Sequence, residues 1–411
     1  MKNWVTKKLD EVCDLITCGV AAKPDYVDDG IPFLSAKNVK EGQIIWSGYN
    51  CISEKTHKEL TKNNKPLLGD ILYTRVGSYG EAAVIEDDNE FSVFVSLTLI
   101  KVDKTVLNNY FLKHYLNSDF VKRLAKKSIS SSGVGNLNVG TVREFPILVP
   151  TLPEQQRIVA ILDEAFAAIA KAKTNAEQNL KNSKELFESY LQGVFENKGE
   201  GWEEKTLGEV LVKTETVDPT KKTNEEFIYL DVSSVNKETK EIENATVLLG
   251  KDAPSRARKL VRTNDVIFAT VRPTHSRVAL ITEEYDEQVC STGYFVLRAK
   301  EFLNNNLVYY FLLTYSFNKQ MEKLQKGASY PAVTDSEVKG IYISFPKSLK
   351  EQQTIVQKLD ALSAETKKLE AIYKQKINDL EELKKSVLQK AFSGELRGGE
   401  PVEPKTNALA V

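Results

Sequence analysis

Hydrophobic residues recur at alternating steps of three and four along two long segments, 153–197 and 350–397. This spacing gives a helix one continuous apolar stripe and is typical of heptad repeats. The pattern therefore predicts two long helices that bury their stripes. It assigns the following residues to a coiled-coil core: Ile158, Leu162, Ile169, Leu180, Ile355, Leu359, Leu362, Leu369 and Leu380.

Each long segment opens with a helix start signal. Thr151 precedes Glu154, and Ser348 precedes Glu351, which is the spacing of a capping box. A helix of about 45 residues at about 1.5 Å per residue would be longer than the surface of one small domain. We therefore expect the two helices to pair with each other, as an antiparallel coiled coil within the chain.

The remaining segments, 1–152 and 198–349, have a different pattern. Short apolar runs are interrupted by Gly, Asp, Asn and Pro, which predicts strands separated by turns. Helical periodicity predicts a helix at 107–126 and another at 306–325. These segments are predicted to form two mixed α/β domains, so the fold class is α+β.

The chain repeats itself after about 200 residues. PEQQRIVAILD at 153–163 returns as KEQQTIVQKLD at 350–360, with seven of eleven positions identical. YFLKHYLNSDFVKRL at 110–124 is matched with YFLLTYSFNKQMEKL at 310–324. One duplicated unit predicts two pseudo-twofold-related domains joined by the helices. The predicted division is a first domain (1–152), a spacer helix (153–197), a second domain (198–349), a second spacer helix (350–397) and a C-terminal tail (398–411).

Composition narrows the class of protein. Of the 411 residues, 41% are hydrophobic and 27% are charged. No apolar run approaches the length of a membrane helix, about 20 residues, and the start lacks a signal-peptide core. The four cysteines and three histidines are scattered, so we expect a cytoplasmic protein with neither disulfides nor a metal site.

A net charge of −1 does not by itself suggest a nucleic-acid partner. The charge is unevenly distributed, however. One basic cluster contains Arg256, Arg258, Lys259, Arg262, Arg272 and Arg277, and another contains Lys122, Arg123, Lys126 and Lys127. Either cluster could be a solvated face or a phosphate-binding surface, and charge alone does not decide between them.

The sequence offers little evidence of a catalytic motif. The chain has no phosphate-binding GxxxxGK[ST] loop, no GxGxxG opening a helix after a strand, and no Pro-Pro pair of the adenine-methyltransferase kind. Asp231, Glu238 and Lys240 imitate a nuclease motif, but the first repeat has no counterpart. We therefore expect no active site in this chain.

Two loops in each repeat carry residue types that bind nucleic acid. One spans 69–80 and returns at 264–277, and the other spans 130–138 and returns at 326–331. Arg, Asn and hydroxyl side chains read base edges, and Lys or Arg binds phosphate. The predicted DNA-binding residues are Arg75, Ser78, Tyr79, Lys126, Lys127, Asn136, Asn138, Arg256, Arg258, Arg272, Thr274, His275, Arg277, Lys326 and Tyr330.

The pattern resembles the specificity subunit of type I restriction–modification systems. The resemblance covers about residues 1–397 and rests on Pro153-Glu154-Gln155-Gln156 with its copy Glu351-Gln352-Gln353, and on Gly69-Asp70-Ile71-Leu72 with its weaker copy Asn264-Asp265-Val266-Ile267. Lys350 stands where the first copy has Pro153. The resemblance implies two target recognition domains and a spacer coiled coil.

The same resemblance implies the partners. They would be double-stranded DNA, two modification (methyltransferase) subunits and restriction (endonuclease/translocase) subunits. The chain itself would bind no cofactor, while partner subunits would use S-adenosylmethionine, ATP and Mg. Because the loops of the two repeats differ, the expected target is bipartite and asymmetric, and partner subunits would methylate adenine or cut.

Two alternatives stay open. The chain could be a coiled-coil scaffold or decoy that docks on methyltransferase subunits without reading DNA. A nuclease that uses Asp231, Glu238 and Lys240 is the third possibility.

Overall fold

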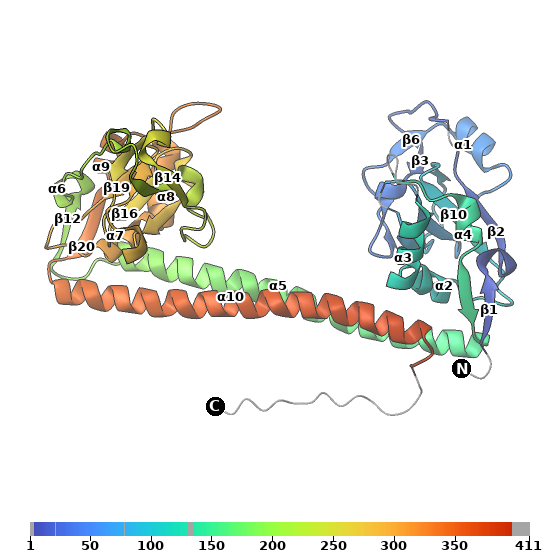
Figure 1. Ribbon diagram of the computed structural model, residues 1–411. Helices are drawn as coiled ribbons and strands as arrows, with labels where there is room; N and C mark the ends of the chain where they lie inside the picture. Colours follow the sequence, from blue (N-terminus) through green and yellow to red (C-terminus); the bar gives the residue numbers. More distant parts are fainter. Residues whose placement is uncertain (1–3, 21, 78, 130–134, 397–411) are drawn as a thin grey trace, which may run out of the picture. The chain divides into compact units, whose positions relative to one another are not determined.

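The computed structural model describes residues 4–20, 22–77, 79–129 and 135–396 (Figure 1). The chain forms two compact units, Met1–Ala176 with Gln375–Val411, and Glu177–Lys374. Each unit contains one α/β domain and half of each long helix. The compact units therefore cut across the predicted spacer segments instead of following their ends. No helix in the described ranges is long and apolar enough to cross a membrane.

The domain of the first unit is built on a four-stranded antiparallel sheet in the order β2-β10-β7-β8. Its core contains Tyr73, Phe111 and Leu116. The strands are β1 (Val5–Lys8), β2 (Cys13–Cys18), β3 (Ile31–Leu34), β4 (Val39–Lys40), β5 (Gln43–Ile44), β6 (Asn50–Ile52), β7 (Ile71–Thr74), β8 (Ala82–Val84), β9 (Ser92–Val93), β10 (Leu97–Val102) and β11 (Pro146–Val149). The helices are α1 (Glu54–Thr61), α2 (Asn109–Leu116), α3 (Asp119–Ser128) and α4 (Val139–Arg143), with 3-10 turns η1 (Leu9–Glu11) and η2 (Ala36–Asn38).

The domain of the second unit repeats this plan with a three-stranded sheet, β17-β16-β19, and a four-stranded sheet, β14-β13-β18-β15. The strands are β12 (Trp202–Thr206), β13 (Glu226–Leu230), β14 (Thr246–Leu249), β15 (Ala257–Leu260), β16 (Val266–Ala269), β17 (Val278–Leu280), β18 (Val289–Ser291), β19 (Tyr294–Leu297) and β20 (Tyr342–Pro346). The helices are α6 (Leu207–Val210), α7 (Asn305–Leu312), α8 (Tyr315–Leu324) and α9 (Asp335–Lys339). The 3-10 turns are η3 (Pro219–Lys221), η4 (Val232–Ser234), η5 (Gly250–Asp252), η6 (Pro273–His275) and η7 (Glu283–Tyr285).

The structure corrects the register of the repeat. Helix α2 follows the N-cap Asn108, and helix α7 follows the N-cap Asn304. The match of 110–124 with 310–324 is therefore wrong by one helical turn, an error that helical periodicity tolerates because residues four apart lie on the same face. The single helices predicted over 107–126 and 306–325 are also wrong. Each is two helices, because Ser118 and Thr314 cap a new helix within the segment.

The long helices α5 (Leu152–Glu196) and α10 (Leu349–Phe392) pair inside each unit. In the first unit Leu162 of α5 and Leu388 of α10 share one hydrophobic core, and Lys173 forms an ion pair with Glu381 at 2.5 Å. The start of α5 thus lies against the end of α10.

In the second unit the end of α5 lies against the start of α10. Leu191 and Leu359 share a core there, and Lys184 lies 3.7 Å from Glu370. The pairing is antiparallel in both units, which confirms the predicted coiled coil. The structure corrects one core position, since Leu369 is 39% exposed while Thr366, three residues earlier, is buried. The other predicted core residues are buried or half-buried.

Candidate functional site

The two candidate loops of the second unit lie side by side. Val271 bridges Ala332, and the backbone N–H of Arg272 donates to the carbonyl of Pro331 at 2.7 Å. The first unit has the same arrangement, in which Val76 bridges Asn136. Loops separated by about 60 residues of sequence therefore form one surface in each unit, which the sequence analysis did not predict.

Arg272 lies where the two loops of the second unit meet. Its guanidinium stacks on the ring of Tyr330, 5.2 Å from the ring centroid, and Tyr330 is 73% exposed. Stacking of this kind fixes the plane of a guanidinium and leaves its N–H donors free for a ligand. Arg272 makes no ion pair with any residue that the structure describes.

The turn after Arg272 is held from two sides. Asn318 of α8 donates through Nδ2 to Ser276 Oγ at 2.6 Å and to the Thr274 carbonyl at 3.3 Å. Lys240 donates through Nζ to the Ser276 carbonyl at 2.7 Å. The short 3-10 turn η6 therefore presents His275 from a fixed backbone.

Several cationic side chains lie around η6. Partial burial lowers the pKa of His275, and the charges of Arg272, Lys237 and Arg277 lower it further. Burial lowers the pKa of Lys240 to about 8, and the nearby Arg277 acts in the same direction. Burial is the larger cause of both shifts, so the positive character of this surface rests on the cations around His275, namely Arg272, Lys237 and Arg277. Such a group of cations favours an anion, for which a phosphate backbone is a suitable source.

Arg75 does not lie on the exposed loop of the first unit, contrary to expectation. It is buried at 7% exposure, and its guanidinium donates to the carbonyls of Leu137 at 2.8 Å and Val95 at 3.0 Å and to Asn136 Oδ1 at 3.0 Å. These bonds hold the two loops of the first unit together. Arg75 and Arg272 are also not equivalent, because the position of Arg272 is occupied by Gly77, whose N–H faces Gly135.

The other predicted residues of the first unit have varied surroundings. Tyr79 is half-buried against the core, and Asn138 caps α4 by accepting from the N–H of Gly140 at 2.8 Å. Lys126 and Lys127 are exposed in the last turn of α3, and Asn136 is exposed. Ser78 and residues 130–134 lie outside the described ranges.

Three of the six residues in the predicted basic cluster of the second unit are paired with acids, and so is Lys326 of the neighbouring loop. Arg258 lies 3.3 Å from Asp218 and Lys326 lies 2.9 Å from Glu337. Lys259 pairs with Asp335 and Arg262 with Glu215 in the same way. Arg277 donates to the carbonyl of Val235, while Arg256 is exposed. The sequence cluster is therefore spread over the domain, and only Arg272 and Arg277 of its members lie beside η6 among the described residues.

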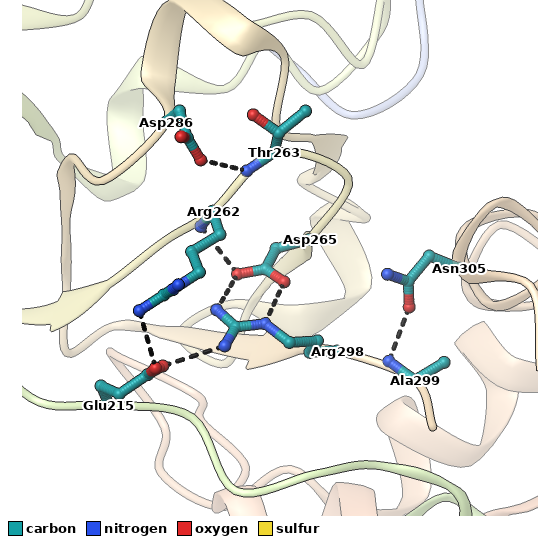
Figure 2. A network of polar contacts seen from close by, with 8 residues as sticks. All are labelled: Glu215, Arg262, Thr263, Asp265, Asp286, Arg298, Ala299 and Asn305. Atoms are coloured by element: carbon teal, nitrogen blue, oxygen red, sulfur yellow. Dashed lines mark hydrogen bonds and ion pairs between the residues drawn. The ribbon is translucent and has the colours of Figure 1, made fainter. Parts of the chain in front are cut away.

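Asp265 of the repeated Asp-Val-Ile motif has a structural role. It is 1% exposed, and its carboxylate accepts from Nε and Nη2 of Arg298, both at 2.7 Å (Figure 2). It also accepts from the backbone N–H of Arg262 at 2.9 Å, and Glu215 contacts both arginines. Its counterpart Asp70 accepts from the N–H of Leu67 and pairs with Lys101. The motif fixes the start of the central strands β7 and β16.

The suspected nuclease residues do not converge on a metal site. Lys240 is directed at the carbonyls of Ser276 and Lys237, and Asp231 contacts Ser233. Over the ranges that the structure describes, no group of three or more His, Cys, Asp or Glu side chains could hold a metal ion.

Sequence reasoning missed Lys240 and Asn318 as residues of this surface. Lys240 was considered only for a nuclease motif, and Asn318 lies in a segment matched one turn out of register. The signal for Asn318 was its place on the helix after the Thr314 cap, since that helix contacts η6.

Comparison with known proteins places these features in a family. Residues 1–180 and 199–382 match the type I restriction modification DNA specificity domain. The chain is 20% identical over 424 residues to the type I restriction enzyme StySPI specificity subunit of Salmonella potsdam, covering 96% of this chain and 89% of that protein. It is 24% identical over 180 residues to the EcoBI specificity subunit of Escherichia coli, covering 43% of this chain but only 37% of that relative.

Solved structures share the fold. A chain from a structural study of complex assembly and conformational transition in the type I R-M system has a TM-score of 0.77 and 19% identity, with 96% of this chain and 99% of that chain covered. The crystal structure of the HsdS subunit from Thermoanaerobacter tengcongensis has a TM-score of 0.61 and 18% identity, with 96% and 97% covered. With its duplicated domains, its helix pair and both halves matched, this chain belongs to the type I restriction modification DNA specificity domain family.

Proposed function

We propose that this specificity chain reads its DNA target through the paired loops of each domain, one domain for each half of a bipartite target. DNA sequence recognition within a type I restriction–modification complex is the function of the family. The observation that carries the finer proposal is the exposed stack of Arg272 on Tyr330 beside the positive η6 turn. A guanidinium with free donors is suited to the acceptor pair of guanine or to phosphate.

The target is proposed to be asymmetric. At the two ends of the reading turn the second unit has Arg272 and Ser276, whereas the first unit has Gly77 and Gly80. Different side chains at equivalent places present different donors to the groove. The two halves of the target would therefore differ in sequence.

Catalysis is proposed to reside in partner chains. Of the suspected nuclease residues, Lys240 donates to two backbone carbonyls and Asp231 accepts from Ser233. This chain would join two modification subunits and the restriction subunits, which would supply the sites for S-adenosylmethionine, ATP and Mg. The proposed count of two modification subunits follows from the duplication, because each unit offers a similar docking surface.

Sequencing of modified adenines tests this proposal in a host that carries the modification subunits. The wild-type chain should direct methylation to one bipartite motif. Arg272→Ala should relax one position in one half of the motif, at a cost in affinity of about 1–3 kcal/mol. If the motif is the same without this chain, the scaffold alternative replaces DNA reading.

A further inference from the structure

We propose that Lys240 and Asn318 are positioning residues for the Arg272–Ser276 loop, and that they hold it in one DNA-reading conformation. This inference rests on the proposed function, and it assigns a role in specificity to side chains that need not touch DNA.

The backbone of this loop is strained at both ends. Arg272 has φ 50° and Ser276 has φ 48°, both in the left-handed region that side chains with a Cβ disfavour. The first unit has Gly77 with φ 80° and Gly80 with φ 92° at the equivalent positions, where glycine adopts this conformation freely. The second unit therefore presents side chains at the two positions that the first leaves to glycine. Such strain persists only where the surroundings enforce it.

Two side chains, which we call clamps, hold the strained conformation by hydrogen bonds to Ser276. Lys240 Nζ donates to the carbonyl of Ser276 at 2.7 Å, and Asn318 Nδ2 donates to the hydroxyl of the same residue at 2.6 Å. Asn318 also reaches the carbonyl of Thr274 at 3.3 Å. The bonds converge on the residue that ends the turn, so the direction of Arg272 and His275 depends on both clamps.

Lys240 lies on a turn that is special to the second unit. Val39 pairs with Ile44 in the first unit, whereas Val235 bridges Ile242 in the second, so the turn of the second unit is two residues longer. Lys240 itself has φ 62° in that longer turn. The clamp and the strained loop thus occur together in one unit, while the shorter turn accompanies the glycine loop in the other.

The longer turn is anchored to the long helices of its own unit. Glu241, next to Lys240, forms an ion pair with Lys367 of α10 at 2.9 Å. The carboxylate of Glu188 on α5 is near enough to favour the charged form of Lys240. An exposed ion pair therefore links the turn that carries Lys240 to the helix pair of its own unit.

The test uses the complex with its modification subunits and three duplexes: the target found by methylation sequencing, and the same duplex with either half scrambled. Lys240→Met should weaken binding to the full target about tenfold. It should not change binding to the duplex in which the half read by the second domain is scrambled. Lys240→Arg should retain discrimination, since a guanidinium can donate the same bond. Lys213→Met, an exposed lysine elsewhere in the domain, is the matched control and should change neither.

A double variant tests the strain directly. Ser276→Gly placed in the Lys240→Met chain should restore part of the lost discrimination, because glycine needs no clamp to adopt a left-handed conformation. Asn318→Ala should reproduce the loss in discrimination. Thermal unfolding of each variant checks that the domain remains folded.

The remaining outcomes overturn the inference. Equal weakening on all three duplexes, with a salt slope reduced by about one, would make Lys240 a phosphate contact. Unchanged discrimination in a folded Lys240→Met complex would remove its positioning role. Failure of the proposed function looks different, because the wild-type complex would then bind target and scrambled duplexes alike.

Discussion

The backbone N–H of Asn108 donates a 2.7 Å hydrogen bond to the buried side chain of Gln155 at the start of α5. Gln155 in turn donates to the carbonyls of Val106 at 3.0 Å and Pro150 at 2.9 Å. Gln352 makes the same three bonds in the second unit, with Asn304 as its donor at 2.8 Å. The repeated Glu-Gln-Gln sequence thus has a physical reason, since its first glutamine joins a long helix to its domain.

Removal of this side chain should destabilise the first unit. Gln155→Ala leaves one N–H and two carbonyls without a partner, at an expected cost of about 2–4 kcal/mol in the free energy of unfolding. Gln156→Ala is the control, because Gln156 is exposed one residue later. Urea unfolding measures both. Equal stability of the two variants would contradict a docking role for Gln155.

Asp265 should be among the least replaceable residues of the second unit. Asp265→Ala leaves the Arg298 guanidinium, whose side chain is 20% exposed, without its bidentate partner. The expected cost is about 3–5 kcal/mol. Asp252→Ala, at an exposed carboxylate, should cost little. Thermal unfolding compares them, and a matching melting temperature would argue against the network of Figure 2 as a structural element.

Acid should weaken the first unit through His114. Burial lowers the pKa of His114 to about 4, from an ordinary value of 6.5, and Lys113 contributes, although Asp163 opposes the shift. The folded state then binds fewer protons than the unfolded state between these values, so stability is present above pH 6.5 and is lost as pH falls through 4.

The second unit suggests the variant that tests this acid sensitivity. Tyr310 occupies the place of His114 and donates to Asp360 at 2.6 Å, as His114 Nε2 contacts Asp163 at 2.9 Å. His114→Tyr should keep the bond and flatten the pH dependence of unfolding between pH 4 and 6.5. An unchanged pH profile would assign the sensitivity to other groups.

Alkaline pH should impair reading by the second domain. The pKa of Lys240 is lowered to about 8, chiefly by burial and then by Arg277, while Glu188 and Glu238 raise it. The amine therefore loses its charge as pH rises through 8, and its bond to the Ser276 carbonyl weakens. For stability the sign is opposite, since the penalty of burying the charge falls as pH rises from about 8 to the ordinary pKa of 10.5.

The measurement is half-site discrimination between pH 7 and 9. The wild-type complex should lose discrimination for the half read by the second domain, and Lys240→Arg should retain it because arginine stays charged. Loss of discrimination in both proteins would place the titrating group elsewhere.

The long-range plan of this chain was predictable from its sequence, and the local geometry of its surface was not. A heptad stripe and a repeated motif report burial and duplication, so the helix pair and the repeated loops were predicted, whereas the contact between the two loops of a unit was not. Arg75 was misjudged because nothing in the sequence distinguishes a guanidinium that ties two loops together from one that faces solvent. Lys240 was misassigned because its partner is a backbone carbonyl, which no side-chain pattern records.

The hydrogen bonds of Gln155 and Gln352, which join each domain to a long helix, have a consequence for how such a chain can acquire a new DNA target. Gln155 and Gln352 bind the segments that open α2 and α7, away from the turns that differ between units. A new reading turn can therefore be grafted onto either domain without disturbing the contacts between that domain and the long helices. A graft of 272–276 into the first domain would also need the longer clamp turn, 236–241, to travel with it. The reading loop and the turn that carries Lys240 would then be inherited together.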